Sequence, residues 1–410
     1  MSKKIVVIGA GAAGLFASGI ASESGAEVTL LEKNSFAGKK LNITGKGRCN
    51  VTNNCDFEAL LSNIPQNPRF MYSAFSMFSP QDMMDFLENQ GVKLKTERGN
   101  RVFPESDRAR DITDALVSFA KKNGVKIKKD TSALGLITEG GAIKGVATDK
   151  GDILCDGVIV ATGGASYPLT GSTGDGYRFA REVGHTVCET EGSLVPLVSE
   201  DICKTAQGLT LKNVILTAKT EKGKVVFSEF GEMLFTHFGM SGPLVLSASA
   251  HMRDLKKEKY RICIDLKPAL SPEKLEERIL SDVEEKKNKD INNLLRGLMP
   301  ASLIQLVLYK AGIDGVIKAN SLTREMRKTL RDTMKCLSFD VLSKRPIQEA
   351  IITTGGINVR EINPKTMESK IISGLYFVGE VLDVDAYTGG FNLQIAWSSA
   401  FVAGRASAEE

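Results

Sequence analysis

The first thirty residues alternate between apolar runs and a segment of small residues. Residues 5–8 read Ile-Val-Val-Ile, a β-branched run that predicts a buried strand. An Ala- and Leu-rich segment follows and stops at Gly25, which predicts a helix to about Ser24. Residues 27–31 return to an apolar run and predict a second strand. A strand, a helix and a second strand in this order indicate an α/β fold with a parallel sheet.

The turn between the first strand and the helix is rich in glycine. Gly9, Gly11 and Gly14 form a G-x-G-x-x-G pattern, with Ala12 and Ala13 inside it. Gly9 permits a tight turn, Gly11 lets a pyrophosphate approach the backbone, and Gly14 allows the helix to pack closely on the strand. The free N–H groups at the helix start then bind the phosphates. The pattern predicts a dinucleotide site.

The second predicted strand ends in Glu32, followed by Lys33. A carboxylate at this place accepts hydrogen bonds from an adenosine ribose. The alternative, glycines that serve only helix packing, leaves Glu32 unexplained. This unit alone allows either NAD or FAD.

A long polar loop, residues 34–56, comes next and is rich in glycine and in basic residues. Loops of this length without their own structure are usually functional or disordered. Backbone donors and cations suit the phosphates and ring edges of a cofactor. The alternative is a solvated basic loop.

Several segments together resemble a known family. They are GKKLNITGKGRCNVTN at 38–53, ATGG at 161–164, TGDG at 173–176, FTHFGMSGP at 235–243 and GE…TGGFNLQIAWSS at 379–399. They are similar to bacterial NAD(P)/FAD-dependent oxidoreductases that include aminoacetone oxidase and a dehydro-bile-acid reductase. They resemble more distantly the succinate dehydrogenase and fumarate reductase flavoproteins. The resemblance implies bound FAD.

The resemblance also assigns residues to the cofactor. Within the polar loop it implies that five residues lie near the flavin: Lys40, Thr44, Gly45, Arg48 and Asn50. It implies that Asp175 helps to hold FAD and that Ala133 touches the adenine through its backbone. Thr162 and Gly163 follow a buried strand at 158–160, where small residues let a ligand approach closely.

The end of the chain predicts a return to the first domain. A buried strand at 375–378 ends in Gly379 and Glu380, and an acid there meets ribityl or pyrophosphate-side hydroxyls. Gly390, Asn392 and Leu393 begin the last helix, whose positive N-terminal end suits the flavin pyrimidine edge. The alternative is a helix that only packs on the sheet.

The hydrophobic pattern changes in the middle of the chain. Short strand-like runs at 194–198, 209–217, 224–227 and 260–265 indicate a β-rich insert, and 272–343 shows helical spacing. We therefore predict an α/β protein with a Rossmann-like FAD-binding domain of the glutathione-reductase type, a β-rich insert and a small helical subdomain. We predict the FAD-binding domain at residues 1–192 and 356–410. The β-rich insert is predicted at 193–271 and 344–355, and the helical subdomain at 272–343.

His237 is the candidate catalytic residue. It is one of three histidines and lies in the FTH-x-G-x-SGP motif. An imidazole titrates near neutrality, so it suits a proton donor beside the flavin. A structural role in the 239–242 loop is equally open, and we expect His185 and His251 to be structural. We expect chemistry at the flavin N5, in a cleft between the FAD domain and the insert, on a small-molecule substrate.

The reductant and the oxidant stay open. No second G-x-G-x-x-G is present for a nicotinamide, so NAD(P)H as a transient partner and O₂ are both possible. Four arginines at 98, 101, 108 and 110 suit an anionic substrate or NAD(P)H, or an ordinary ion-paired surface. A dinucleotide sensor without turnover is a further alternative.

Charge and cysteine usage narrow the picture further. The net charge is +4, from 53 basic and 49 acidic residues, which demands neither a nucleic-acid nor a membrane partner. The basic segment 324–335 favours a solvated helix face over RNA binding, although an RNA-modifying flavoprotein remains the alternative function.

Seven cysteines without a C-x-x-C pair indicate reduced thiols, no metal site and a cytoplasmic protein. The sequence leaves the oligomeric state open.

Overall fold

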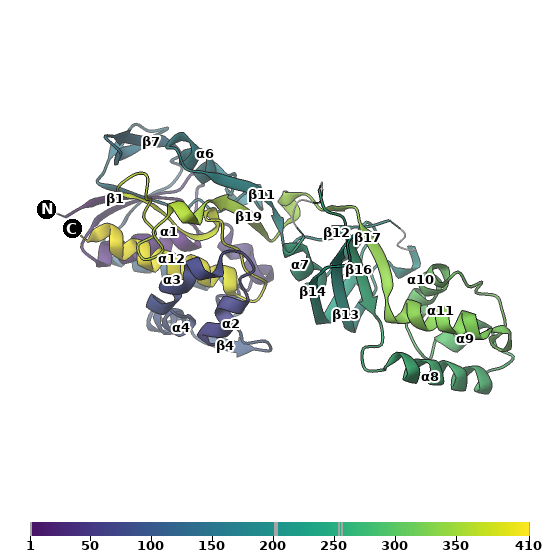
Figure 1. The fold of residues 1–410 in the computed structure, drawn as a ribbon. Helices are drawn as coiled ribbons and strands as arrows, with labels where there is room; N and C mark the ends of the chain where they lie inside the picture. The colour runs from purple at the N-terminus through teal and green to yellow at the C-terminus, as the bar shows by residue number, and fades with distance from the viewer. Residues whose placement is uncertain (1, 201–203, 253–254, 256, 410) are drawn as a thin grey trace. The chain divides into compact units, whose positions relative to one another are not determined.

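The computed structural model describes residues 2–200, 204–252, 255 and 257–409, and the chain divides into two compact units (Figure 1). The first unit is Met1–Ser193 with Ile347–Glu410, and the second is Leu194–Pro346. Each unit has its own hydrophobic core. Residues 347–355, which the sequence pattern assigned to the insert, belong to the first unit.

A five-stranded parallel sheet forms the centre of the first unit. Its order is β20 (Leu375–Phe377), β10 (Gly157–Val160), β1 (Lys4–Ile8), β2 (Glu27–Leu31) and β6 (Lys126–Lys128). Three helices contribute to its core: α1 (Ala12–Glu23), α5 (Ala109–Lys122) and α12 (Phe391–Ala408). The ring of Phe16 on α1 packs edge-on against Trp397 of α12 at 6.0 Å. The predicted strand–helix–strand start and its parallel sheet are confirmed.

Smaller elements surround this sheet. Two three-stranded antiparallel sheets consist of β3 (Thr52–Asn53), β4 (Leu94–Glu97) and β5 (Arg101–Pro104), and of β7 (Ala133–Glu139), β8 (Ala142–Thr148) and β9 (Ile153–Leu154). The helices are α2 (Phe57–Ser62), α3 (Tyr72–Met77), α4 (Pro80–Asn89) and α6 (Asp175–Glu182). An antiparallel pair, β11 (Val187–Ser193) and β19 (Ile352–Ile357), stands at the two points where the chain leaves and re-enters the unit.

The second unit is built on a seven-stranded antiparallel sheet. Its order is β17 (Leu337–Val341), β16 (Tyr260–Asp265), β13 (Thr210–Thr220), β14 (Val225–Phe235), β15 (Gly239–Ser241), β12 (Leu197–Val198) and β18 (Ser343–Lys344). Its helices are α7 (Pro243–Ala250), α8 (Pro272–Glu285), α9 (Ile291–Leu295), α10 (Ala301–Ala311) and α11 (Arg324–Lys335). Helix residues such as Ile279 and Leu330 share one core with sheet residues such as Phe339. The predicted helical segment therefore has no separate core.

The prediction of unpaired cysteines was wrong at one place. Cys263 on β16 and Cys336 at the end of α11 form a disulfide, with their Cα atoms 4.9 Å apart. The pairing of β16 with β17 places Leu337 opposite Ile264, and this brings the neighbouring cysteine to its partner. A separation of 73 residues leaves no trace of this contact in the sequence.

The other described cysteines are free thiols: Cys49, Cys55, Cys155 and Cys188. Burial raises the pKa of Cys49 and of Cys155 to about 12 and that of Cys55 to about 11. Cys49 is fully buried, in keeping with a packing role. Cys203 lies outside the described residues.

None of the helices in the described part of the chain combines the length and the apolarity needed to cross a bilayer.

Candidate cofactor site

The glycine turn after β1 has two tightly packed glycines and one open glycine. Gly9 has φ +100°, and a Cβ atom there would lie 2.7 Å from the carbonyl oxygen of Ala161. A Cβ atom at Gly14 would lie 1.8 Å from the carbonyl oxygen of Gly9. At Gly11, by contrast, no described atom lies within 4 Å of such a position. The turn therefore leaves open space directly over the backbone at Gly11.

Helix α1 begins at this open space. Gly11 is its N-cap, and no side chain caps the helix. The first N–H groups of a helix have no acceptor within the helix, so those around Ala12 and Ala13 are available to a phosphate. The open space and these free donors fit the pyrophosphate of a dinucleotide.

Glu32 lies at the rim of the glycine turn and is almost fully buried. One of its carboxylate oxygens accepts a hydrogen bond from the N–H of Ala10 at 2.9 Å. The other accepts from the backbone N–H of Asn34 at 2.8 Å and from its side-chain amide at 2.7 Å. A carboxylate has about four acceptor positions, so capacity remains for a ribose hydroxyl.

Lys33 and Asp175 form an ion pair with each other. The Lys33 Nζ lies 2.6 Å from the Asp175 Oδ2 and donates to the Thr173 hydroxyl at 2.6 Å. Although burial alone would raise the pKa of Asp175, the hydrogen bond and the charge of Lys33 hold that pKa below its usual value. Asp175 is the first residue of α6, where a carboxylate is favoured by the helix dipole.

The segment after β10 packs against the start of α6. A Cβ atom at Gly176 would lie 2.3 Å from the Thr162 hydroxyl oxygen, and Gly163 has φ +72°. The two small-residue motifs, ATGG and TGDG, therefore adjoin in space. Their contact brings Thr162, Gly163 and Asp175 to one end of the parallel sheet.

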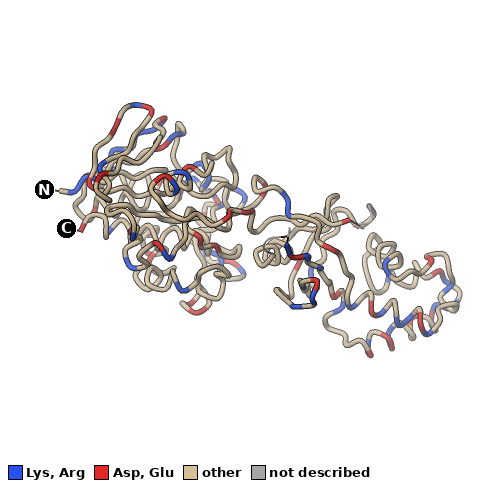
Figure 2. Tube along the Cα trace, turned by 45° about the horizontal axis from the view of Figure 1, so that its top comes forward, with Lys and Arg blue, Asp and Glu red and all other residues tan. Residues whose placement is uncertain are grey.

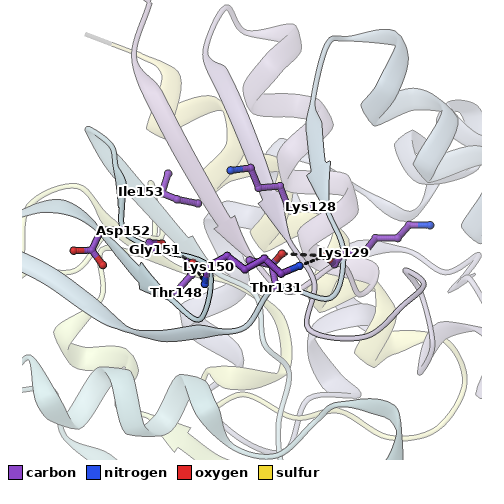
Figure 3. Close-up of a pocket in the computed structure, with 8 residues that line it drawn as sticks. All are labelled: Lys128, Lys129, Thr131, Thr148, Lys150, Gly151, Asp152 and Ile153. Atoms are coloured by element: carbon purple, nitrogen blue, oxygen red, sulfur yellow. Dashed lines mark hydrogen bonds between the residues drawn. The ribbon is translucent and has the colours of Figure 1, made fainter.

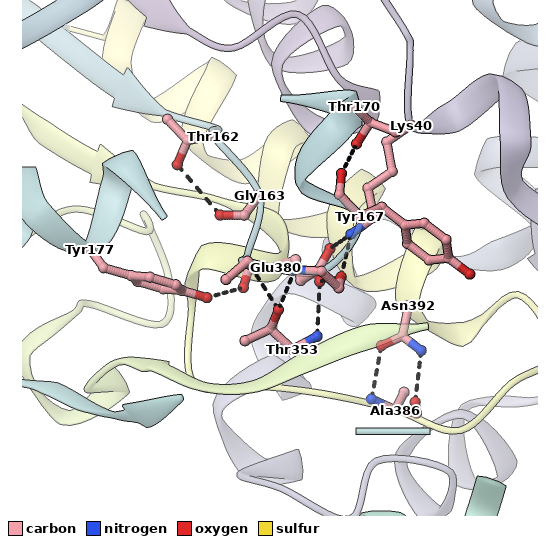
Figure 4. Close-up of polar contacts among 12 residues, drawn as sticks. Lys40, Thr162, Gly163, Tyr167, Thr170, Tyr177, Thr353, Glu380, Ala386 and Asn392 are labelled. Carbon is pink, nitrogen blue, oxygen red and sulfur yellow. Dashed lines mark hydrogen bonds and ion pairs between the residues drawn. The ribbon is translucent and has the colours of Figure 1, made fainter. Parts of the chain in front are cut away.

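Lys40 and Glu380, 340 residues apart in sequence, form a second ion pair (Figure 4). The Lys40 Nζ lies 2.6 Å from the Glu380 Oε2 and 2.8 Å from the Ser166 hydroxyl. The other Glu380 oxygen accepts from the Thr353 N–H at 2.9 Å. Each side chain of the pair is only 21% exposed. The pair joins the polar loop to three other segments of the unit.

This ion pair lies near the start of α1. Gly379 directly precedes Glu380, and a Cβ atom there would lie 3.2 Å from the Cβ of Ala13. The residues predicted from the two ends of the chain, at the glycine turn and at Gly379–Glu380, thus meet in the folded unit.

Within the polar loop, Asn50 and Arg48 differ in their surroundings. The Asn50 Oδ1 is buried and has no hydrogen-bond partner among the described residues. Such an orphaned acceptor fits a ligand that donates to it. Arg48 instead pairs with Glu97 and Asp107 and lies 4.1 Å over the ring of Phe103. The guanidinium of Arg48 therefore binds other side chains of the protein rather than pointing freely toward a ligand.

Thr44 and Gly45 shape the backbone of the same loop. The Thr44 hydroxyl donates to the Leu41 carbonyl at 2.7 Å, and Gly45 has φ +56°. A Cβ atom at Gly45 would lie 3.1 Å from the Asn50 nitrogen. Gly45 therefore lies directly against the backbone of Asn50, and Thr44 fixes the turn just before it.

The turn before α12 packs closely on β3. Gly390 is the N-cap of α12 with φ +102°, and a Cβ atom there would lie 2.3 Å from the Thr52 carbonyl oxygen. The Asn392 side chain accepts from the Ala386 N–H at 2.9 Å and donates to the Ala386 carbonyl at 2.7 Å (Figure 4). Asn392 thus holds the chain at Ala386, while Leu393 is half-buried against the core of the first unit.

Ala133 begins β7, close to Glu32 in the fold. The Thr131 N–H donates to the Glu32 carbonyl at 3.0 Å, which ties this segment to the end of β2. A pocket of about 350 Å³ lies beside it (Figure 3). Lys128 and Lys129 on its rim point away from one another, and the Lys150 Nζ donates to the Lys129 carbonyl. Its cations therefore do not converge on one ligand position.

In the second unit, His237 is exposed at the end of β14. Its ring lies edge-on to Phe238 at 4.9 Å. The guanidinium of Arg345 lies 4.6 Å over the same Phe238 ring. Sequence reasoning missed Arg345, because a cation beside β18 has no local signal that links it to a motif more than a hundred residues earlier.

The two other histidines have protein partners. His185 is buried, with its Nδ1 3.1 Å from Glu361 and its Nε2 2.7 Å from the Ser369 hydroxyl. His251 lies 5.6 Å from the ring of Phe227. These contacts agree with the structural roles expected for both.

The basic helix α11 uses most of its charge inside the second unit. Arg327 donates to the Leu322 carbonyl, and Arg331 pairs with Glu276 and Asp332. Lys335 pairs with Asp265 at 2.6 Å. Figure 2 shows basic and acidic residues interspersed along both units. The helix is therefore a poor candidate for an RNA-binding face.

The fold and the glycine turn define a dinucleotide-binding protein of the Rossmann type. The chain matches the model of the HI0933-like protein Rossmann domain over residues 3–406 and belongs to this family. The family is one of flavoproteins, and the cofactor is FAD. The predicted fold class and cofactor are confirmed.

Similar proteins cover nearly the whole chain. The ribosomal RNA dihydrouridine synthase of Haemophilus influenzae is 32% identical over 97% of this chain and 96% of its own. The enzyme of the same name in Escherichia coli is 30% identical, with the same coverage. The 3-dehydro-bile acid Δ4,6-reductase of Clostridium scindens is 30% identical over 99% of both chains.

One solved structure shows the likeness of fold. The 3-ketosteroid Δ1-dehydrogenase of Sterolibacterium denitrificans gives a TM-score of 0.52 at 13% identity, covering 99% of this chain and 100% of that chain.

Proposed function

We propose that this protein is an FAD-dependent reductase of a carbon–carbon double bond that is conjugated to a carbonyl group. The observation that carries the proposal is the shared chemistry of the relatives that match almost the full chain. A dihydrouridine arises when the ring double bond of uridine, which is conjugated to a carbonyl, becomes saturated. A Δ4,6-reductase acts on double bonds conjugated to a steroid ketone.

The proposed cofactor residues divide into three groups. The first holds the ADP part: Gly9, Gly11, Ala12, Ala13, Gly14, Glu32, Lys33, Ala133, Thr162, Gly163 and Asp175. The second meets the ribityl and flavin part: Lys40, Thr44, Gly45, Asn50, Gly379, Glu380, Gly390, Asn392 and Leu393. The third group is Arg48 alone. Its guanidinium pairs with Glu97 and Asp107, so we propose that it supports the cofactor site indirectly, by holding the segments that carry these two residues. The open space at Gly11 and the orphaned Asn50 oxygen support these assignments.

The reaction adds a hydride to one carbon of the double bond and a proton to the other. When bound in its reduced form, the flavin would supply the hydride, and NAD(P)H would supply the two electrons that the substrate takes up. His237 is the proposed proton donor, because its side chain is exposed and histidine is the most common general acid in enzymes. NAD(P)H is the proposed reductant that restores the reduced cofactor.

The test uses the purified holoprotein under anaerobic conditions. The flavin absorbance should bleach on mixing with NADH or NADPH and return on adding a conjugated enone or a uridine oligonucleotide. Saturated analogues are the matched controls and should leave the flavin reduced. Reoxidation by O₂ alone, with no response to any conjugated acceptor, would contradict the proposal and favour an oxidase.

The role of His237 has its own readout. His237→Gln should slow reoxidation by the acceptor without changing the rate of bleaching, because only the reduction of the acceptor needs a proton delivered to carbon. An equal loss in both half-reactions would indicate a structural role.

A further inference from the structure

Two arginines lie on a hairpin next to the proposed flavin end of the first unit. The hairpin joins β4 to β5, and its tip carries Arg98 and Arg101, both exposed. Gly99 and Asn100 between them have φ of +76° and +57°, which makes the tip narrow. The Arg101 Nε donates to the Arg98 carbonyl at 3.0 Å, so the two residues form one local structure.

The tip is bound to the turn that precedes α12. The side-chain amide of Asn53 donates to the Gly99 carbonyl at 3.0 Å and to the Gly389 carbonyl at 3.0 Å. The Asn54 N–H also donates to the Asn100 carbonyl at 2.7 Å. One side chain therefore joins the arginine tip to the glycine turn assigned to the flavin.

Two acidic side chains of this region, Glu97 and Asp107, pair with cations outside the tip. Glu97 pairs with Arg48, and Asp107 pairs with Arg48 and with Lys95 at 2.8 Å. A hydrogen bond from Arg48 lowers the pKa of Glu97, and hydrogen bonds from Lys95 and Arg48 lower that of Asp107. Both carboxylates are therefore charged, and each pairs with cations other than Arg98 and Arg101.

The neighbouring arginines differ from the two at the tip. Arg108 pairs with Asp111 at 3.3 Å, and Arg110 pairs with Asp114 at 3.5 Å. Within the described ranges, neither Arg98 nor Arg101 has a carboxylate oxygen within 4 Å. The tip therefore carries two uncompensated guanidinium groups beside the cofactor turn.

We propose that Arg98 and Arg101 bind a phosphate group of a ligand that reaches the flavin edge. Guanidinium groups bind phosphate in a bidentate way, and two of them at one tip suit a single phosphate or two adjacent ones. The phosphate belongs either to a nucleotide substrate or to an NAD(P)H reductant. The inference rests on the proposed function for the identity of these ligands and for the position of the flavin, and on the structure for the pair of exposed arginines.

The experiment compares Arg98→Gln/Arg101→Gln with the matched control Arg108→Gln/Arg110→Gln. Both double variants remove two positive charges from the same stretch of chain, and both should keep their FAD content and thermal unfolding temperature. The ligands are NADPH and a fluorescently labelled uridine oligonucleotide, with binding measured at about 50 and 200 mM salt. The tip variant should bind one of them at least ten-fold more weakly than the control, with a smaller salt dependence.

The outcome identifies the source of the phosphate. A loss confined to NADPH binding and to flavin bleaching assigns the tip to the reductant. A loss confined to oligonucleotide binding assigns it to the substrate. Equal binding by the tip variant and the control, for both ligands, overturns the proposal. Because binding is measured at equilibrium, the result stands even if the protein reduces no conjugated acceptor.

Discussion

At the scale of single residues, Gly11 and Gly14 have different roles although they are only three positions apart: one leaves space for a ligand, and the other allows close packing. A side chain at Gly11 points into open space, whereas one at Gly14 collides with the backbone at Gly9. The sequence pattern makes the two glycines equivalent members of one motif. Only the structure separates the glycine that a ligand needs from the one that the fold needs.

Substitution by alanine should separate these two needs. Gly11→Ala should leave the unfolding free energy of the apoprotein nearly unchanged and weaken FAD binding by about ten-fold or more, because the methyl group occupies the pyrophosphate space. Gly14→Ala should lower the unfolding free energy by about 2–4 kcal/mol through overpacking. Urea unfolding and fluorescence titration with FAD measure the two effects. A Gly11→Ala variant that binds FAD normally would contradict the assignment of the pyrophosphate.

His185 makes a pH-dependent contribution to stability. Its ring is buried between Glu361 and Ser369, and burial lowers the pKa of His185 below its ordinary value. The unfolded state therefore binds more protons than the folded state near pH 6, and stability falls as the pH drops from about 7 to about 5.

The variant His185→Gln should reduce this pH dependence. It keeps a side chain that can hydrogen bond but does not titrate, so the loss of stability over this pH range should shrink, whatever the absolute stability of the variant. Urea midpoints at several pH values are the measurement. The same slope in the variant and the parent would show that His185 is not the titrating group.

At the scale of elements, the Lys40–Glu380 pair connects segments that no local pattern relates. It joins the polar loop, the segment after β10, β19 and the turn after β20 through Ser166 and Thr353. Removing one partner of a mostly buried pair leaves the other charge without compensation.

A double-mutant cycle tests this connection. Lys40→Met should lower the unfolding free energy of the apoprotein by about 1–3 kcal/mol, and Glu380→Gln in the same chain should restore part of the loss. The exposed ion pair Lys126–Glu27 is the control, and its removal should leave the unfolding free energy almost unchanged, because water screens exposed charges. If the two substitutions change the unfolding free energy additively, the side chains of Lys40 and Glu380 do not stabilise the fold through their mutual contact.

At the scale of the whole molecule, the chain forms two units with separate cores. The proposed FAD residues all belong to the first unit. FAD at about 100 times its dissociation constant should stabilise that unit by about 2.7 kcal/mol.

Hydrogen exchange on the full chain can locate this stabilisation. Amides of β1, β2 and α1 should exchange more slowly with FAD bound, whereas amides of the central strands β13 and β16 should be unaffected. Equal protection throughout both units would mean that the chain unfolds as one cooperative block.

Local patterns determined much of this protein in advance. The apolar runs and the glycines at turns predicted β1, α1, β2, the last helix and four strands of the second unit, β12, β13, β14 and β16, because period and turn chemistry are properties of neighbouring residues. The prediction of helix up to residue 343 was wrong at β17, which pairs with the distant strand β16. They also predicted that Gly9 to Gly14 and Glu32 form a dinucleotide site. The resemblance of separated motifs narrowed the cofactor to FAD.

The tertiary structure decided what depends on contacts between distant segments. It paired Lys33 with Asp175 and Lys40 with Glu380, joined Cys263 to Cys336, and engaged Arg48 with Glu97. It also used the charges of α11 inside the second unit and left those of Arg98 and Arg101 exposed. The sequence lists the charged groups, but the packing of elements decides which groups neutralise one another and which remain available to a ligand.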